Sequence, residues 1–496
     1  MSGRMASDAP ATSWHEVFST APVPALALVC AGVWLHAADG LLVATMIPAI
    51  VAELGGQRLL PWSIILYELG SIVAGAASAL SALRFGLVRC MGAGATVYAT
   101  GCATSALAPD MPVLLAGRLA QGVGGGGLMA LSFVAIPLMF DSRLQARVMA
   151  LVSTAWMLSA LSGPLIGGLF VASSGGWRAG FWCFALQSGC MVGWLMLRPP
   201  GPDAIAPARQ QGGGLSIGRL VLLAAGILCV GVAGTGTPDP LRAASWGVAG
   251  VSLLTLFLRA DARSGTGRLL PRRPLFPGSE AGPAMLLVLC FAASTIGMSL
   301  YGTLLITELH GISELAVGGV LALEAVAWTG TAALVSGRPP RTDGRYILTG
   351  LSIVALSILG LAWSVPGGPA GAIVACAVLQ GIGFGMAWTF VLRRATAASD
   401  PDEAARIAGA IPTVQRVGYA LGAAWLGVVA NAAGPLPSSD LETLQRIART
   451  LFAACVPFAS CGWLAAAVLV SRGRPARPRG SGAWSTGSGS KRGVGG

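Results

Sequence analysis

Apolar residues occur along this chain in fourteen long stretches, most of them near twenty residues, separated by short polar loops. A helix of about twenty apolar residues spans the hydrocarbon core of a bilayer and satisfies its backbone hydrogen bonds without water. The pattern therefore predicts an all-α integral membrane protein. The expected spans are 24–50, 62–83, 91–108, 112–138, 148–172, 179–197, 217–235, 245–258, 283–306, 315–336, 346–365, 370–392, 407–431 and 450–471.

Composition agrees with this pattern and argues against a soluble enzyme. Hydrophobic residues make up 54% of the chain, charged residues 10%, and the mean hydropathy is +0.72. Soluble domains carry about 25% charged residues. The three histidines form no HExxH or other catalytic cluster, and the ten cysteines form no CxxC. We therefore expect no enzyme activity, no cofactor, no metal site and no disulfide framework.

The basic residues predict the orientation of the chain in the membrane. The net charge is +12, but the 32 Lys and Arg residues sit in alternate loops, which argues against a nucleic-acid partner. Placing the N-terminus in the cytoplasm puts 25 of them inside and five outside, as the positive-inside rule requires. Both termini are then cytoplasmic, and the number of spans is even.

Two loops divide the predicted spans into groups of six, two and six. One loop is rich in Pro and Gly (198–216), and the other carries five arginines and three prolines (259–280). We expect a cytoplasmic N-terminal segment, a six-helix bundle, a linker with two extra transmembrane helices, a second six-helix bundle and a disordered cytoplasmic tail. These parts cover residues 1–23, 24–197, 198–280, 281–471 and 472–496.

Five ionisable residues lie inside predicted spans: Asp39, Glu68, Arg118, Glu324 and Arg416. Each costs about 2.5–3.5 kcal/mol at the centre of a membrane helix, so each is a candidate functional residue. Burial disfavours the charged form of Asp39, which would suit it to carry protons, or it could form a static hydrogen bond between helices. Glu68 could share the proton or contact a cationic substrate, and Arg118 requires a carboxylate or carbonyl partner.

Glu324 and Arg416 are the charged residues of the second half. They could pair with each other across the bundle, or either could face a substrate cavity that Trp156 helps to line. In the fourth span, three glycines share the GxGxxG spacing of a dinucleotide loop. Such a loop needs a preceding strand, which the sequence lacks, so the glycines predict close helix packing. These glycines are Gly122, Gly124 and Gly127.

The fifth span contains proline and glycine in the sequence SGPLIGG. Proline frees a backbone carbonyl and glycine removes side-chain bulk, so a bend with a close helix contact is expected. Such a bend could act as a hinge that seals one face of a carrier, or it could be a purely structural kink. Its residues are Gly163, Pro164, Gly167 and Gly168.

Together these stretches resemble the major facilitator superfamily, in its fourteen-helix drug:proton antiporter branch. Asp39 and Pro48 match the first-helix motif of that branch, and Trp62 and Tyr67 match the start of its second helix. The stretch AGRLAQGVGGGG resembles its fourth-helix arginine motif, and SGPLIGG resembles its fifth-helix antiporter motif. Trp177-Arg178 and LLPRRPLFPGS resemble the starts of the sixth helix and of the second bundle.

The resemblance implies two six-helix bundles around a central cavity, with two additional helices between them. It also implies alternating access, with Arg118 assisting proton coupling and the bend in the fifth helix closing the cavity. In the loop after the second helix, the chain keeps the family's gating residues Arg84, Gly86 and Arg89. Leu83 stands where the family has an aspartate that latches the cytoplasmic face, which puts the usual gating pair in doubt.

The sequence therefore predicts a proton-coupled exporter of several small molecules, a multidrug or toxic-compound antiporter. The alternative is a dedicated carrier of one metabolite or anion from the same superfamily. Such a carrier would either export its substrate or take it up together with protons. The expected partners are the substrate, protons and the lipid bilayer, and the expected state is a monomer. Lys491 is the only lysine among many arginines, which suggests a high-GC bacterial source and hence the bacterial inner membrane.

Overall fold

The computed structural model describes residues 23–197, 217–235, 240–264, 268–271, 273–279, 281–396, 401–434 and 440–472. Regular structure in these ranges is helical throughout. The predicted N-terminal segment, the Pro/Gly-rich loop and the C-terminal tail lie outside the described residues, apart from their boundary positions.

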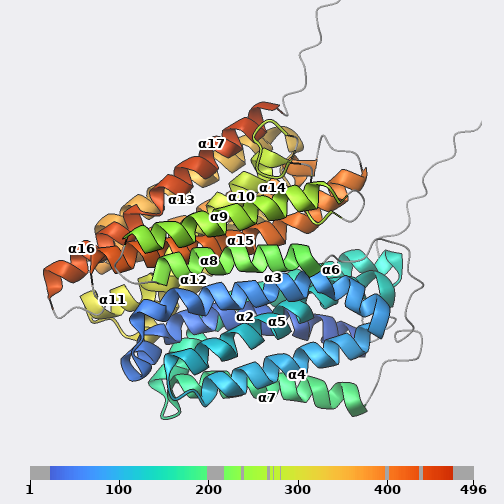
Figure 1. Ribbon diagram of the computed structural model, residues 1–496, viewed down its shortest axis with the longest axis horizontal. Coiled ribbons are helices and arrows are strands. Elements are labelled where there is room, and N and C mark those ends of the chain that lie inside the picture. The colour runs from blue at the N-terminus through green and yellow to red at the C-terminus, as the bar shows by residue number, and fades with distance from the viewer. Residues whose placement is uncertain are drawn as a thin grey trace, which may run out of the picture.

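The helices form two groups in Figure 1, with α8 and α9 between them. The first bundle contains α2 (Val23–Leu54), α3 (Leu60–Phe85), α4 (Leu87–Ala106), α5 (Met111–Met139), α6 (Ser142–Ala172) and α7 (Gly176–Leu197). The intervening helices are α8 (Ile217–Thr235) and α9 (Pro240–Ala262). The second bundle contains α10 (Gly282–Gly297), the π-helical turn η4 (Met298–Gly302), α11 (Thr303–His310), α12 (Glu314–Val335), α13 (Asp343–Gly367), α14 (Ala370–Thr396), α15 (Pro401–Ala433), α16 (Leu441–Ala453) and α17 (Val456–Arg472).

Within the described residues, twelve helical segments are long and apolar enough to cross a membrane. The predicted third and thirteenth spans, which correspond to α4 and α15, are not among them. The reason is composition: α4 is rich in Gly, Ala and Thr, and α15 carries Glu403, Arg406 and Arg416. These twelve segments of the described residues agree with the predicted multi-pass membrane protein.

Three predicted spans differ in detail from the helices. The short eighth span is the middle of α9, whose 23 residues include more polar ends. The ninth is interrupted by η4, and such π-helical turns occur mostly inside longer helices. The fourteenth is divided between α16 and α17. Pro457 lies at the start of α17, where its missing N–H removes no helical hydrogen bond.

Glycines of α5 bring three helices of the first bundle into close contact. A methyl group added at Gly122 would lie 2.1 Å from the carbonyl oxygen of Tyr67 in α3. One added at Gly124 would lie 2.4 Å from the backbone nitrogen of Tyr98 in α4. Close approach of this kind replaces the hydrophobic driving force that lipid cannot supply. The predicted packing face is confirmed, and the glycine run lies inside a helix and not in a nucleotide-binding loop.

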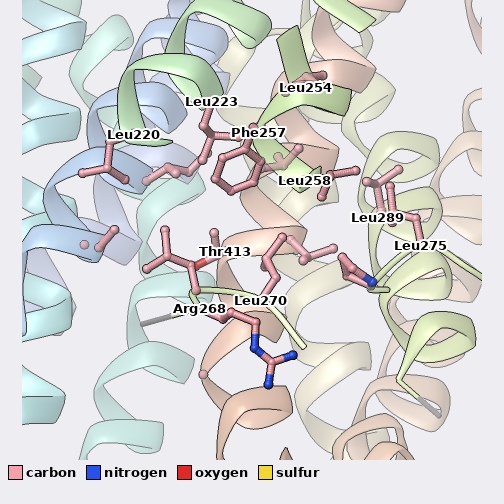
Figure 2. Close-up of a pocket in the computed structure, with 18 of the residues that line it drawn as sticks. Leu220, Leu223, Leu254, Phe257, Leu258, Arg268, Leu270, Leu275, Leu289 and Thr413 are labelled. Carbon is pink, nitrogen blue, oxygen red and sulfur yellow. The ribbon is translucent and has the colours of Figure 1, made fainter. Parts of the chain in front are cut away.

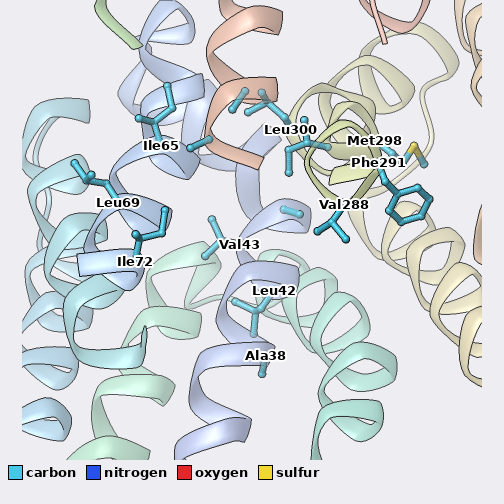
Figure 3. Packing of buried hydrophobic residues seen from close by; sticks show 14 of the residues in the cluster. Ala38, Leu42, Val43, Ile65, Leu69, Ile72, Val288, Phe291, Met298 and Leu300 are labelled. Atoms are coloured by element: carbon cyan, nitrogen blue, oxygen red, sulfur yellow. The ribbon is translucent and has the colours of Figure 1, made fainter. Parts of the chain in front are cut away.

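The two bundles meet along α8, which packs against α3 and α15 (Figure 2). A methyl group added at Gly231 of α8 would lie 3.0 Å from the Trp62 ring of α3, and one at Gly234 would lie 2.4 Å from the Ala424 carbonyl oxygen of α15. The Asn431 amide of α15 also donates a hydrogen bond of 2.6 Å to the Gly234 carbonyl oxygen. Figure 3 shows a second part of this boundary, where buried side chains of α2 and α3 lie near those of α10 and η4.

Candidate functional site

A buried ion pair joins α2 to α5 inside the first bundle. Nη1 of Arg118 lies 2.8 Å from Oδ2 of Asp39, and the two side chains are 3% and 0% exposed. The other carboxylate oxygen, Oδ1, is buried and has no hydrogen-bond partner among the described residues. Arg118 therefore contacts one oxygen of this carboxylate, and the other oxygen is the candidate position for a proton.

The Arg118 guanidinium has further partners in the same pocket. It donates to Oε1 of Gln121 at 2.5 Å and, through Nε, to the Ser63 carbonyl oxygen at 3.4 Å. Its Cζ lies 4.3 Å from the centre of the Tyr67 ring, a cation–π distance. These contacts do not involve Asp39, so the guanidinium keeps them when the Asp39 carboxylate is neutral.

His36 connects this pair to the second bundle. Nη2 of Arg416 lies 2.6 Å from Nε2 of His36. Arginine can only donate, so Nε2 accepts, and the ring is neutral with its proton on Nδ1. That proton points to the Tyr67 hydroxyl oxygen, 3.0 Å away, and the hydroxyl donates to the His36 carbonyl oxygen, also at 3.0 Å. Each donor in this series of contacts therefore has one acceptor.

Arg416 links the second bundle to α3. Its Nη1 lies 3.2 Å from Oε2 of Glu68 and donates to the Ser71 hydroxyl at 2.6 Å. Arg416 and Glu68 are each 13% exposed, so the pair is largely buried. The pair between Glu324 and Arg416 that the sequence left open does not form, because Arg416 pairs with Glu68 of the first bundle.

Glu324 lies apart from this network, in α12. Its Oε1 accepts a hydrogen bond of 2.9 Å from the Gln380 amide of α14. One turn further along α12, Trp328 begins an aromatic cluster with neighbouring ring centres 4.5–5.6 Å apart. The cluster consists of Trp328, Phe384, Trp388 and Phe291. Trp156 is half-buried and packs against the apolar core from α6.

The predicted hinge residues lie in α6, wedged between α2 of the same bundle and α12 of the other. A methyl group added at Gly167 would lie 2.1 Å from the Thr45 hydroxyl oxygen of α2, and one at Gly168 would lie 2.6 Å from Cα of Leu315 in α12. Gly163 and Pro164 lie one turn earlier in the same contact. The Pro164 carbonyl oxygen would be 2.4 Å from a methyl group at Gly318. The two bundles thus touch through α6 and α12.

The predicted gating loop lies at the surface, between α3 and α4. Gly86 has φ of +90°, a conformation that glycine adopts without strain, and it ends α3 and begins α4. Arg84 and Arg89 are exposed, and the Arg84 guanidinium lies 5.2 Å from the centre of the Phe85 ring. The side chain at position 83 lies outside the described residues.

Four polar residues whose side chains belong to the site were not singled out from the sequence: His36, Ser71, Gln121 and Gln380. His36 precedes Asp39 by three residues and Gln121 follows Arg118 by three, a spacing that places side chains on one helix face. That spacing could have identified both. Gln380 reaches Glu324 from a different helix, and no sequence signal marks this contact.

Ionisable side chains buried among membrane helices are rare and mark candidate substrate or ion pathways. The sequence profile of the Major Facilitator Superfamily matches residues 29–423, and the chain belongs to this family. The family is one of transporters and not of enzymes.

Two relatives from Mycobacterium tuberculosis strains, CDC 1551 / Oshkosh and H37Rv, are each described as a "probable multidrug-efflux transporter". Each is 32% identical over 436 residues, which cover 85% of this chain and 90% of the relative. The efflux pump dotC of Dothistroma septosporum is 25% identical over 66% of this chain and 57% of its own length.

Solved structures share the fold at lower identity. A POT family transporter in complex with 5-aminolevulinic acid superimposes with a TM-score of 0.63 at 14% identity, covering 93% of this chain and 97% of that one. An inward-facing bacterial homologue of the human lysosomal transporter Spinster gives 0.60 at 15% identity, covering 91% and 98%. The inward-open xylose transporter XylE from E. coli gives 0.56 at 14%, covering 90% and 95%.

Proposed function

We propose that the protein is a proton-coupled antiporter that exports several small molecules, cationic and aromatic ones in particular. The multidrug-efflux names of its relatives support export. The observation that carries the proton coupling is the unpartnered Oδ1 of Asp39, buried beside an arginine that keeps other partners. A carboxylate in this setting can accept a proton without leaving a bare guanidinium in the membrane interior.

Proton binding at Asp39 and substrate binding at Glu68 are linked in this proposal. Protonation of Asp39 removes its charge and weakens its ion pair with Arg118. Arg118 contacts Tyr67, and Tyr67 contacts His36. His36 in turn accepts from Arg416, the partner of Glu68. A cationic substrate competes with Arg416 for Glu68, so its arrival separates the bundles at this point.

Glu324 and the aromatic cluster supply a second binding element. Aromatic faces attract organic cations by about 0.5–2 kcal/mol, and a nearby carboxylate adds charge selectivity. Gln380 orients the Glu324 carboxylate by its hydrogen bond. Contacts of this kind tolerate ligands of different shape, as export of several compounds requires.

The proposed topology has fourteen spans, with α4 and α15 crossing the membrane as well. The 20 residues of α4 reach about 30 Å, the thickness of the hydrocarbon core. The 33 residues of α15 are longer still, and the Arg416–Glu68 pair offsets the cost of its charge. We place the protein as a monomer in a bacterial inner membrane, with both termini in the cytoplasm.

Proton movement in everted membrane vesicles tests the proposal. A quenched pH-gradient dye is followed while a panel of cationic drugs and anionic metabolites is added, for wild type and Asp39→Asn. We expect several unrelated cations to release protons through wild type. The variant should lose this response and still exchange substrate down its gradient, since only the proton site is removed.

The outcomes separate the proposal from its alternative. An active, proton-coupled Asp39→Asn variant would remove Asp39 from the mechanism. A response confined to one anion would favour a dedicated metabolite carrier. The variant's elution as a monodisperse peak on size-exclusion chromatography shows that a loss of response does not come from misfolding.

A further inference from the structure

Arg416 reaches from α15 into the first bundle and contacts two acceptors there. One guanidinium nitrogen, Nη2, donates to Nε2 of His36 at 2.6 Å, and the other, Nη1, lies 3.2 Å from Oε2 of Glu68. The two nitrogens are bonded to the same carbon, so both acceptors are neighbours at the end of one planar group. Any movement that withdraws Arg416 therefore frees the imidazole lone pair and the carboxylate together.

The His36 ring has further contacts, and these come from the first bundle. Nδ1 lies 3.0 Å from the Tyr67 hydroxyl oxygen, and the two rings are stacked with their centres 5.5 Å apart. A methyl group added at Gly125 of α5 would lie 3.3 Å from Nδ1, so α5 also packs against the ring. These contacts do not involve Arg416. The ring therefore keeps its orientation, with Nε2 facing the position of the guanidinium, when Arg416 withdraws.

The ionised side chains around His36 carry no net charge in this arrangement. Asp39 and Arg118 form one ion pair, and Glu68 and Arg416 form the other. The further titratable groups that interact with these residues are the neutral hydroxyls and thiol of Tyr67, Tyr98, Tyr419 and Cys102. Withdrawal of Arg416 leaves one negative charge uncompensated among largely buried groups. Such a charge is costly within a membrane, so a positive charge has to replace the guanidinium.

We propose that His36 is a second binding site for the coupling proton, occupied while Arg416 is withdrawn. The Nε2 lone pair takes the proton, and the imidazolium replaces the guanidinium beside the Glu68 carboxylate. The role in transport rests on the proposed antiport, in which a cationic substrate supplies the same positive charge, so that proton and substrate exclude each other. When Arg416 returns, its N–H group occupies the Nε2 lone pair again and the proton passes to water.

Asp39 and His36 hold the same proton at different stages. With Arg416 withdrawn, one proton on either residue makes the cluster neutral. On His36 the proton leaves the Asp39–Arg118 pair intact, and imidazole binds protons more tightly than a carboxylate does in water. In the transfer the O–H bond of Asp39 breaks and an N–H bond of His36 forms, with water carrying the proton between them. With Asn at position 39, Arg118 already balances Glu68, which agrees with the lost proton response expected for Asp39→Asn.

Nitrogen NMR of the full-length protein with isotope-labelled histidine tests this assignment, because the imidazole shifts distinguish both neutral tautomers from the imidazolium. The chain has three histidines, and the His36 signals are those that His36→Gln lacks. At a pH of about 7.5, wild type should show a neutral His36 with its proton on Nδ1.

Arg416→Met removes the guanidinium and keeps an apolar side chain of similar length. This variant should raise the ratio of charged to neutral His36 about tenfold, as expected for an imidazole beside an unpaired carboxylate. Arg449→Met, at an exposed arginine of α16, is the matched control and should give the wild-type spectrum. Arg416→Ala carries the same expectation and replaces Arg416→Met if that variant does not fold, as judged by monodisperse elution and helical circular dichroism.

Removing either carboxylate should return His36 to the neutral form, because the remaining charges then balance without a proton. The variants are Arg416→Met/Glu68→Gln and Arg416→Met/Asp39→Asn. A neutral His36 in folded Arg416→Met, or an equally charged His36 in the two double variants, would overturn the proposal. The NMR readout requires no transport, so such a failure leaves the proposed antiport standing. A charged His36 in Arg416→Met without any cation response in the vesicle assay would instead contradict the antiport alone.

Discussion

At the scale of single residues, the site consists of two ion pairs connected by His36, which contacts Arg416, and by Tyr67, which contacts Arg118. The sequence identified all four charged members because ionisable residues in apolar spans are few and costly. It could not identify their partners, since Arg416 and Glu68 are separated by 348 positions. His36 was missed because a neutral imidazole is inexpensive to bury and marks no pattern by itself.

The Glu68–Arg416 pair predicts strong coupling in a double-mutant cycle. Glu68→Gln or Arg416→Gln alone leaves one charge largely buried without its counter-charge, so each should lower the free energy of unfolding by about 3 kcal/mol. The double variant should be less destabilised than the sum of the two, because it removes both charges. Denaturant unfolding in detergent measures all four proteins. Strict additivity would show that the pair does not form.

At the scale of helices, the apolar pattern located the helices well but not their interruptions, and among the described residues twelve of the fourteen predicted spans are long and apolar enough to cross a membrane. The π-helical turn η4 and the break between α16 and α17 lie within stretches that are apolar without a gap, so hydropathy carries no trace of them. Proline offers a local sign at Pro457, where α17 begins. The α6 contact was foreseen as a bend, but its partner α12 was not, since that contact is made across the bundles.

We expect Gly168→Ala to shift the equilibrium between the state with α6 and α12 in contact and the state with them apart. The new methyl group would lie 2.6 Å from Cα of Leu315, which cannot move without moving α12. We expect the variant to favour separation of α6 from α12 and to transport about tenfold more slowly. Transport rate and accessibility of a cysteine placed at position 315 to an impermeant thiol reagent measure the two effects.

Gly319→Ala in α12 is the control, because a methyl group there meets no atom within 4 Å. It should match wild type in both measurements. Unchanged transport and accessibility in Gly168→Ala would mean that this contact does not determine which face of the carrier is open.

At the scale of the whole molecule, the described helices form two bundles with α8 and α9 between them, and the division into six, two and six membrane spans stays a prediction. The relative placement of these parts could not be read from the sequence, because it depends on contacts between distant segments. The position of α8 between α3 and α15 is an example. Nothing in the sequence distinguishes its glycines from other glycines of membrane helices, and only the structure places the Trp62 ring and the Ala424 carbonyl oxygen beside them.

Reporter fusions test whether α4 crosses the membrane. If it does, its two ends lie on opposite sides, so alkaline phosphatase fused after residue 109 should be active and green fluorescent protein fused after residue 86 should fluoresce. The reciprocal fusions should be inactive. The same reporters after residue 56 serve as a control for the preceding span. Matching reporter activity at 86 and 109 would instead place both ends of α4 on one side.

The contacts of α8 with α3 and α15 restrict how the two bundles can move relative to each other. Asn431 joins α8 to α15 by a hydrogen bond, while on the other side of α8 a methyl group at Gly231 would meet side-chain atoms of Trp62 and Ile65. When the bundles tilt relative to each other, one of these two attachments has to give way. At Gly234 the backbones of α8 and α15 approach each other closely, whereas at Gly231 the neighbouring atoms of α3 belong to side chains, which can change rotamer. We therefore expect α8, and α9 packed against it, to move with the second bundle while the Trp62 and Ile65 side chains rearrange.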